Sequence, residues 1–297
     1  MKNKCIIECK DEFGRKDMEI IKGKIYDEER AFYGVRGLKC VDCKFDGPQD
    51  GESAFKESGE IEVEDCVFNL RYPFWHDRGV KTEKCRLTEN CRAAFWYTEN
   101  AEILNSELHG IKALRECRDI HIENSDIVSA EFGWFSHNVH IENSRAEGEY
   151  FMLRSSGLEF KNLSFKGKYS FQYVENSVIE NCNLDTKDAF WHAKNVTVKN
   201  SVVKGEYLAW YAENITFENC EIIGTQPLCY CKGLKLVNCS MKECDLSFEK
   251  SEVEATVTSH VDSIKNPIKG SIEVASVGEI IDEYQTKCKI EVTKCLV

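Results

Sequence analysis

Apolar and polar residues alternate along this chain in short segments that return at a fixed interval. Two residues before a recurring asparagine stands an apolar residue, and another stands three residues after it, as at Ile103 and Leu108. The asparagine itself recurs every 19 residues, at Asn105, Asn124, Asn143, Asn162, Asn181, Asn200, Asn219 and Asn238. Alternation at period two is typical of short strands with one buried face. The pattern therefore predicts a strand on each side of the asparagine in every repeat.

A second column marks where the chain turns. Five residues before the asparagine stand Asn100, Asp119, Asn138, Gly157, Asn176, Asn195, Asn214 and Gly233. These residue types tolerate a left-handed backbone, so the column predicts a corner. Short strands and corners at a fixed period, without a helical segment, predict an all-β, right-handed parallel β-helix with 19-residue rungs. We expect the asparagines to form a hydrogen-bonded ladder inside the turn.

The repeat also sets the domain organisation. It runs through residues 20–285 as one parallel β-helix, preceded by an N-terminal extension or cap at 1–19. It loosens after residue 252, which predicts two or three irregular final rungs and a C-terminal tail at 286–297. Neither a linker nor a second domain is predicted.

Cysteine is abundant, with 16 residues, and its placement follows the repeat. The position of the recurring asparagine continues backward through Lys84, Asp65 and Asp42. Cysteines stand directly after this position at Cys43, Cys66, Cys85, Cys182, Cys220 and Cys239, and serines fill other rungs. Such a column predicts a buried seam of small residues with reduced thiols. A zinc site at Cys40 and Cys43, or at Cys229 and Cys231, is the alternative. It would need four converging ligands, so we predict neither a metal nor a cofactor.

Aromatic residues form two adjacent columns. All five tryptophans, Trp75, Trp96, Trp134, Trp191 and Trp210, stand nine residues before the recurring position. The next position holds His76, Tyr97, Glu116, Phe135, Arg154, Tyr173, His192, Tyr211 and Tyr230. Neighbouring residues of a strand point to opposite faces. Because the second column carries charges, we predict that it faces outward and that the tryptophans face the core, with the opposite assignment left open.

The outward column suggests a carbohydrate-binding surface. Rings can stack on sugars, while Tyr, His and Arg side chains supply hydrogen bonds. The candidate ligand-binding residues are Tyr97, Arg115, Arg154, Tyr173, His192, Tyr211 and Tyr230, and the expected partner is an oligosaccharide or polysaccharide. Two alternatives stay open: cross-strand stacking that only stiffens the sheet, and a homodimer interface.

Catalysis is a weaker hypothesis. His76, Asp77 and Glu116 lie near the acidic loop at 46–52 and could serve a polysaccharide lyase or hydrolase. A turn beside ordinary surface ion pairs explains the same residues. His76 and His192 are six rungs, or about 29 Å, apart and cannot share a reaction centre. We therefore predict a binding protein rather than an enzyme.

Charge and hydropathy narrow the possible partners. There are 39 Lys and Arg against 51 Asp and Glu, a net charge of −12, so the chain lacks the basic footprint of a nucleic-acid-binding protein. No stretch approaches 18 consecutive apolar residues, which argues against a membrane partner. The first residues have no apolar signal-peptide core, which predicts a cytoplasmic location.

Several longer segments resemble one known family. They are residues 46–54 (DGPQDGESA), 70–77 (LRYPFWHD), 89–94 (ENCRAA), 109–117 (HGIKALREC), 168–176 (KYSFQYVEN), 188–195 (DAFWHAKN) and 224–231 (GTQPLCYC). The chain resembles, over residues 20–283, a bacterial domain-of-unknown-function family of right-handed β-helix proteins. The resemblance implies a pectin-lyase-like fold and carries over no catalytic residue.

Overall fold

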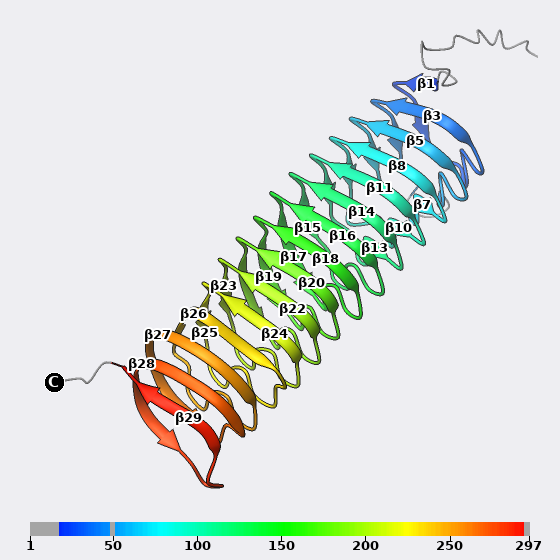
Figure 1. The fold of residues 1–297 in the computed structure, drawn as a ribbon. Helices are drawn as coiled ribbons and strands as arrows, with labels where there is room; N and C mark the ends of the chain where they lie inside the picture. Colours follow the sequence, from blue (N-terminus) through cyan, green and yellow to red (C-terminus); the bar gives the residue numbers. More distant parts are fainter. Residues whose placement is uncertain (1–17, 48–50, 294–297) are drawn as a thin grey trace, which may run out of the picture.

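The computed structural model describes residues 18–47 and 51–293. Over these residues the chain winds into a parallel β-solenoid of about 14 turns, and its described elements are strands without a helix. Figure 1 shows the turns stacked along one axis, from the blue N-terminal end to the red C-terminal end. The predicted fold class is confirmed.

Strands that are mostly six residues long stack into one face of the solenoid, here called the long sheet. Each pairs in parallel with the strand one rung away, as Ile103 does with Ile122. The strands are β1 (Glu19–Lys22), β3 (Arg36–Val41), β5 (Gly59–Glu64), β8 (Arg78–Glu83), β11 (Glu99–Leu104), β14 (Arg118–Glu123), β16 (His137–Glu142), β18 (Ser156–Lys161), β20 (Glu175–Glu180), β22 (Lys194–Lys199), β24 (Glu213–Glu218) and β26 (Leu234–Lys242).

Shorter strands form two further faces. The short sheet contains β2 (Ile25–Tyr26), β4 (Lys44–Phe45), β6 (Val67–Phe68), β9 (Arg86–Leu87), β12 (Glu107–Leu108), β15 (Asp126–Val128), β17 (Arg145–Glu149), β19 (Ser164–Lys168), β21 (Asn183–Lys187), β23 (Val202–Lys204) and β25 (Glu221–Ile223). A three-stranded sheet of β7 (Phe74–Trp75), β10 (Phe95–Trp96) and β13 (Leu114–Arg115) lies on the aromatic side of the N-terminal rungs.

The core is a continuous file of side chains inside the coil. The predicted apolar columns are buried along it, and phenylalanines stack on one another from rung to rung. Phe74 and Phe95 are 4.8 Å apart between ring centroids, and Phe171 and Phe190 are 4.9 Å apart. Apolar burial of this kind is the main stabilising contribution to the fold.

The recurring asparagines adopt the left-handed conformation, with φ of 51° at Asn105 and 49° at Asn200. Their side chains are exposed, so the prediction that they lie inside the turn is wrong. Amide-to-amide hydrogen bonds link Asn162 to Asn143 at 2.8 Å and Asn219 to Asn200 at 3.2 Å. Asparagine is therefore used here for its tolerance of positive φ at an outer corner.

The cysteine column is the buried seam that the repeat predicts. Cys66 and Cys182 donate to the carbonyl oxygens of Glu64 and Glu180, each at 3.2 Å. Serines in the same column continue the pattern, and the Cys182 N–H donates to the Ser201 hydroxyl at 2.9 Å. Thiols and hydroxyls thus satisfy backbone groups inside the corner.

The last rungs are irregular, and strand pairing continues into the segment predicted as a C-terminal tail. β27 (Glu252–Lys265) and β28 (Lys269–Ile281) are long strands that pair with a shift in register. β29 (Lys287–Val292) pairs with β28 inside the segment predicted as a tail. Alternating apolar residues around Cys288 and Ile290 explain why this segment joins the sheet.

Candidate functional site

The two aromatic columns both reach the surface. The phenylalanine before each of Trp75 and Trp96 is buried, the tryptophan is half-buried, and the residue after it is exposed. Left-handed backbone at the third position, with φ of 59° at His76 and 53° at Tyr97, breaks the alternation expected of a strand. The prediction that the tryptophans face the core is therefore wrong, whereas the following column does face outward.

Five residues of the outer column form a continuous stack, which we call the C-terminal ladder: Arg154, Tyr173, His192, Tyr211 and Tyr230. Ring centroids lie 4.8, 5.1 and 4.8 Å apart, with interplanar angles of 9°, 9° and 12°. The Arg154 guanidinium lies 4.5 Å from the centroid of the Tyr173 ring. Each inner ring is covered on both faces, so the ladder exposes ring edges and hydroxyls rather than the open ring faces expected from the sequence.

A groove of about 450 Å³ runs beside this ladder. One wall consists of Arg154, Tyr173, His192 and Tyr211, and Ser155 lies at its base. The other wall is the start of the long-sheet strands, with His137, Ser156, Glu175, Lys194 and Glu213. Sequence reasoning missed this second wall, although its residues all stand six positions before the recurring asparagine.

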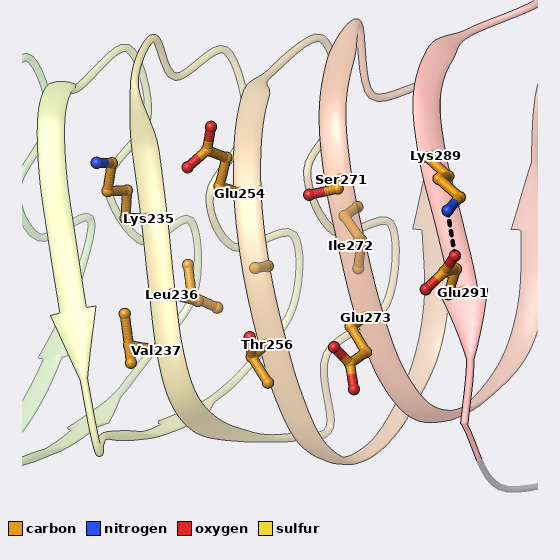
Figure 2. Close-up of a pocket in the computed structure, with 11 residues that line it drawn as sticks. Lys235, Leu236, Val237, Glu254, Thr256, Ser271, Ile272, Glu273, Lys289 and Glu291 are labelled. Atoms are coloured by element: carbon orange, nitrogen blue, oxygen red, sulfur yellow. Dashed lines mark ion pairs between the residues drawn. The ribbon is translucent and has the colours of Figure 1, made fainter.

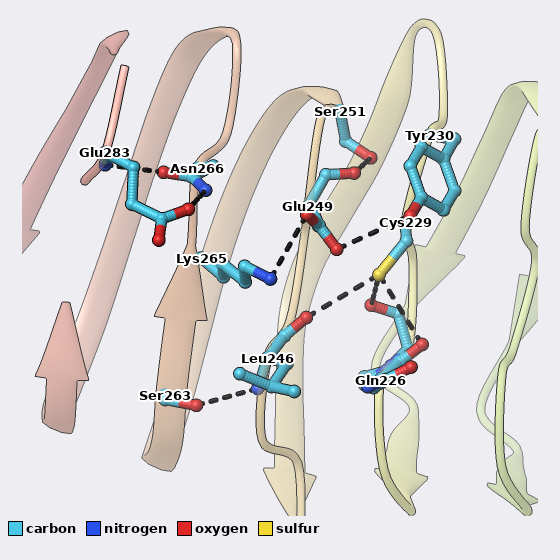
Figure 3. A network of polar contacts seen from close by, with 11 residues as sticks. Gln226, Cys229, Tyr230, Leu246, Glu249, Ser251, Ser263, Lys265, Asn266 and Glu283 are labelled. Carbon is cyan, nitrogen blue, oxygen red and sulfur yellow. Dashed lines mark hydrogen bonds and ion pairs between the residues drawn. The ribbon is translucent and has the colours of Figure 1, made fainter. Parts of the chain in front are cut away.

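The ladder ends in a polar network at its C-terminal side, drawn in Figure 3. The Tyr230 hydroxyl donates to Glu249 at 3.4 Å, and Glu249 pairs with Lys265 at 3.3 Å. Burial, followed by the nearby Glu249 carboxylate, raises the pKa of Tyr230. This network holds the last ring of the ladder in place.

The N-terminal part of the same column is interrupted. His76 and Tyr97 stack at 4.8 Å, and we call this pair the N-terminal stack. The next position is Glu116, which pairs with Arg115 at 3.0 Å and whose hydrogen bond raises the pKa of Tyr97. Tyr97 and Arg115, both predicted to bind ligand, therefore lie outside the groove that unites Arg154, Tyr173, His192 and Tyr211.

The predicted catalytic residues do not converge. Asp77 is 1% exposed and points into the coil, where its Oδ1 accepts the Ser58 N–H at 2.9 Å. Its Oδ2 has no hydrogen-bond partner within residues 18–47 and 51–293. Burial raises the pKa of Asp77 to about 8. Because His76 is exposed while Asp77 is inside, these side chains cannot act together on a polymer at the surface.

A second groove, of about 410 Å³, lies on the outer face of β26 to β29. Figure 2 shows Lys235 and Glu254 on neighbouring strands there, with the ion pair between Lys289 and Glu291 on β29. None of the predicted site residues lines it.

Residues 19–294 match the model of a family described as "Protein of unknown function (DUF3737)". The chain belongs to the DUF3737 family. A search of the curated proteins finds no match for this DUF3737 protein. Within the described residues, no helix is long and apolar enough to cross a membrane.

Solved structures similar to this DUF3737 protein are parallel β-helix proteins. The Streptococcus pneumoniae surface adhesin PfbA is 8% identical, with a TM-score of 0.44, over 88% of this chain and 83% of the adhesin. The A-module of the Azotobacter vinelandii mannuronan C-5 epimerase AlgE4 is 7% identical, with a TM-score of 0.31, over 93% and 90% of the two chains. These likenesses concern the fold.

Proposed function

We propose that the groove beside the C-terminal ladder binds an extended oligosaccharide. The observation that carries this proposal is the pairing of a rigid aromatic wall with a polar wall across about 450 Å³. Tyr173, His192 and Tyr211 present polar ring edges on consecutive rungs, about 4.8 Å apart. A linear sugar chain can offer hydroxyl groups to such a repeating row of donors and acceptors.

The charges of the groove favour a neutral ligand rich in hydroxyl groups. Two carboxylates, Glu175 and Glu213, lie with two cations, Arg154 and Lys194, so neither sign dominates. Lys194 and Glu213 are themselves 3.8 Å apart. Such groups can accept from or donate to sugar hydroxyls without requiring a charged partner.

Stacking contributes by fixing the wall before the ligand arrives. Each ring of the ladder is held by its neighbours, and Tyr230 is held by Glu249. Ordering side chains at an interface costs about 0.5–1.5 kcal/mol each, and a preformed wall avoids part of that cost. Sugar recognition in this groove therefore uses ring edges and hydroxyls, not stacking on ring faces.

The test is a glycan array followed by titration calorimetry with the best neutral oligosaccharide. The double variant Tyr173→Phe, Tyr211→Phe keeps the stack and removes two hydroxyls from the groove. We expect at least about a fivefold loss of affinity, since each of the two hydrogen bonds contributes about 0.5–1.5 kcal/mol. Tyr97→Phe, in the N-terminal stack, is the matched control and leaves affinity unchanged.

Two results would overturn this proposal. One is an array without any bound glycan, and the other is a double variant that binds as tightly as the unaltered protein. Light scattering on the same samples distinguishes the alternative of self-association. The half-exposed edges of Phe135 and Tyr211, at 39% and 45%, give a dimer an apolar contact surface. A blank array together with a dimeric mass would favour that role.

A further inference from the structure

A cluster of possible metal ligands lies on the outer face of the long sheet, away from the ladder groove. It consists of His121 and Glu123 on β14 and Glu142 on β16. The His121 Nε2 lies 3.7 Å from a Glu123 Oε and 3.9 Å from a Glu142 Oε. One ligand atom from each residue falls within 4.8 Å of the other two, and all three side chains are half-buried.

On several other rungs of this face, glutamates are paired with lysines. Lysines pair with the glutamates, as in Lys39–Glu64 at 2.9 Å, Lys81–Glu83 at 3.8 Å and Lys199–Glu218 at 3.9 Å. Lys235, visible in Figure 2, stands in the column that His121 occupies on its own rung. The cluster thus has an imidazole where several other rungs carry a lysine.

Histidine at position 121, in place of a lysine, leaves the two neighbouring carboxylates without a fixed positive charge between them. Glu123 and Glu142 face each other directly in the parallel register of β14 and β16. Like charges directly opposite one another on neighbouring strands are destabilising. Lys161 follows Glu142 on the next rung, and His140 in the adjacent column pairs with Glu159 at 3.2 Å. A bound divalent cation would offset the repulsion between the two carboxylates.

We propose that His121, Glu123 and Glu142 bind a divalent first-row transition ion such as Zn²⁺. Imidazole and carboxylate suit this class of ion, with bonds of about 2.0–2.2 Å. Tetrahedral ligands at those bond lengths are about 3.3–3.6 Å apart. The two histidine-to-carboxylate separations, 3.7 and 3.9 Å, therefore close with shifts of a few tenths of an ångström. The two carboxylate oxygens lie within 4.8 Å of each other, so a rotation of one glutamate side chain brings them to the same spacing.

The site has an open side. It borders a groove of about 360 Å³ that is also lined by His140, Glu159 and Lys161. Three protein ligands leave a position for water or for a group of another molecule. The site is independent of the proposed sugar groove, because none of its three ligands lines that groove.

The experiment is a Zn²⁺ titration of the full chain, followed by NMR of the histidine ring nitrogens. The protein has 7 histidines, so the His121 resonance can be assigned from the His121→Gln variant. We expect the His121 ring to respond with saturation near one equivalent, and His121→Gln or the double variant Glu123→Gln, Glu142→Gln to weaken binding at least tenfold. Circular dichroism checks that each variant is folded.

His260→Gln provides a matched control. His260, on β27, is an exposed histidine that also lies beside a carboxylate, Asp262 at 3.8 Å, but it is not part of a cluster with two acidic partners. This variant should bind Zn²⁺ as the unaltered protein does. A Zn²⁺ response spread equally over His121 and His260 would overturn the proposal, and so would equal binding of Ca²⁺, which would indicate an acidic surface without histidine coordination.

Discussion

The N-terminal and C-terminal halves of the aromatic wall share one core and one repeat, yet differ in how their polar atoms are satisfied. Trp191 and Trp210 donate their indole N–H groups to the carbonyl oxygens of Tyr207 and Gln226, at 2.7 and 2.8 Å. The N–H groups of Trp75 and Trp96 are buried and have no hydrogen-bond partner among the described residues. The indole N–H groups of these tryptophans are therefore satisfied in the C-terminal half and unsatisfied in the N-terminal half.

The outward-facing column from His76 to Tyr230 also differs between the N-terminal and C-terminal halves. In the C-terminal half it is an uninterrupted stack from Arg154 to Tyr230, and in the N-terminal half the stack ends after Tyr97. Asp77 adds a buried carboxyl where other rungs place small residues such as Cys117 and Ser136. A solenoid can therefore keep an unchanged core and change its surface chemistry one rung at a time.

The largest expected effect concerns Asp77→Asn. The pKa of Asp77 is raised from 3.8 to about 8 by burial, so between these values the folded state keeps a proton that the unfolded state releases. The free energy of unfolding therefore falls as pH rises from about 4 to about 8, by about 1.4 kcal/mol per pH unit. Asp77→Asn should remove this slope and be more stable than the unaltered protein at pH 8.

Urea denaturation at pH 5, 6.5 and 8 measures that slope. Asp188→Asn is the control from the C-terminal half, because burial also raises the pKa of Asp188 while Lys187 lowers it. Asp188→Asn should therefore change the slope of the free energy of unfolding against pH less than Asp77→Asn does. If Asp77→Asn leaves this slope unaltered, Asp77 does not keep a proton in the folded state, and the N-terminal half does not differ from the C-terminal half by a buried protonated carboxyl.

A smaller difference is expected between Trp191→Phe and Trp96→Phe. Trp191→Phe loses a hydrogen bond to a carbonyl, whereas Trp96→Phe removes a buried donor that has no partner. The first should therefore cost about 1–2 kcal/mol more than the second in free energy of unfolding. Thermal or urea unfolding of the pair measures this, and equal costs would contradict the comparison.

The smallest effect is expected from Arg154→Met. The substitution removes the cation that lies 4.5 Å from the Tyr173 centroid and keeps an unbranched side chain at the exposed position. An exposed contact of this kind contributes about 0.5–1 kcal/mol. Near-ultraviolet circular dichroism and urea unfolding should show a loosened, slightly less stable ladder. A variant as stable as the unaltered protein would show that Arg154 does not support the stack.

The fold was predictable because the buried positions recur at a fixed interval in the sequence. The positions of Ile103 and Leu108 hold apolar residues throughout the 19-residue repeats. The position of Asn100 holds asparagine, aspartate or glycine, and these residue types indicate positive φ. The direction of the tryptophans was not predictable. Left-handed backbone at Tyr97, Phe135 and Tyr211 has no such signal, since bulky aromatic residues seldom adopt it. The groove and the metal-ligand cluster depend on pairs across rungs, which the columns reveal only once each side chain's direction is known.

The cysteine seam has a consequence for how the coil opens. Its thiols are buried, and burial raises the pKa of Cys43 and, to about 11, that of Cys182, so each stays unreactive while its rung is closed. Local opening of a repeat protein exposes only the rungs involved. Buried thiols from Cys40 to Cys288 are spread along the axis. The order in which a thiol reagent alkylates them therefore shows from which end the solenoid unfolds.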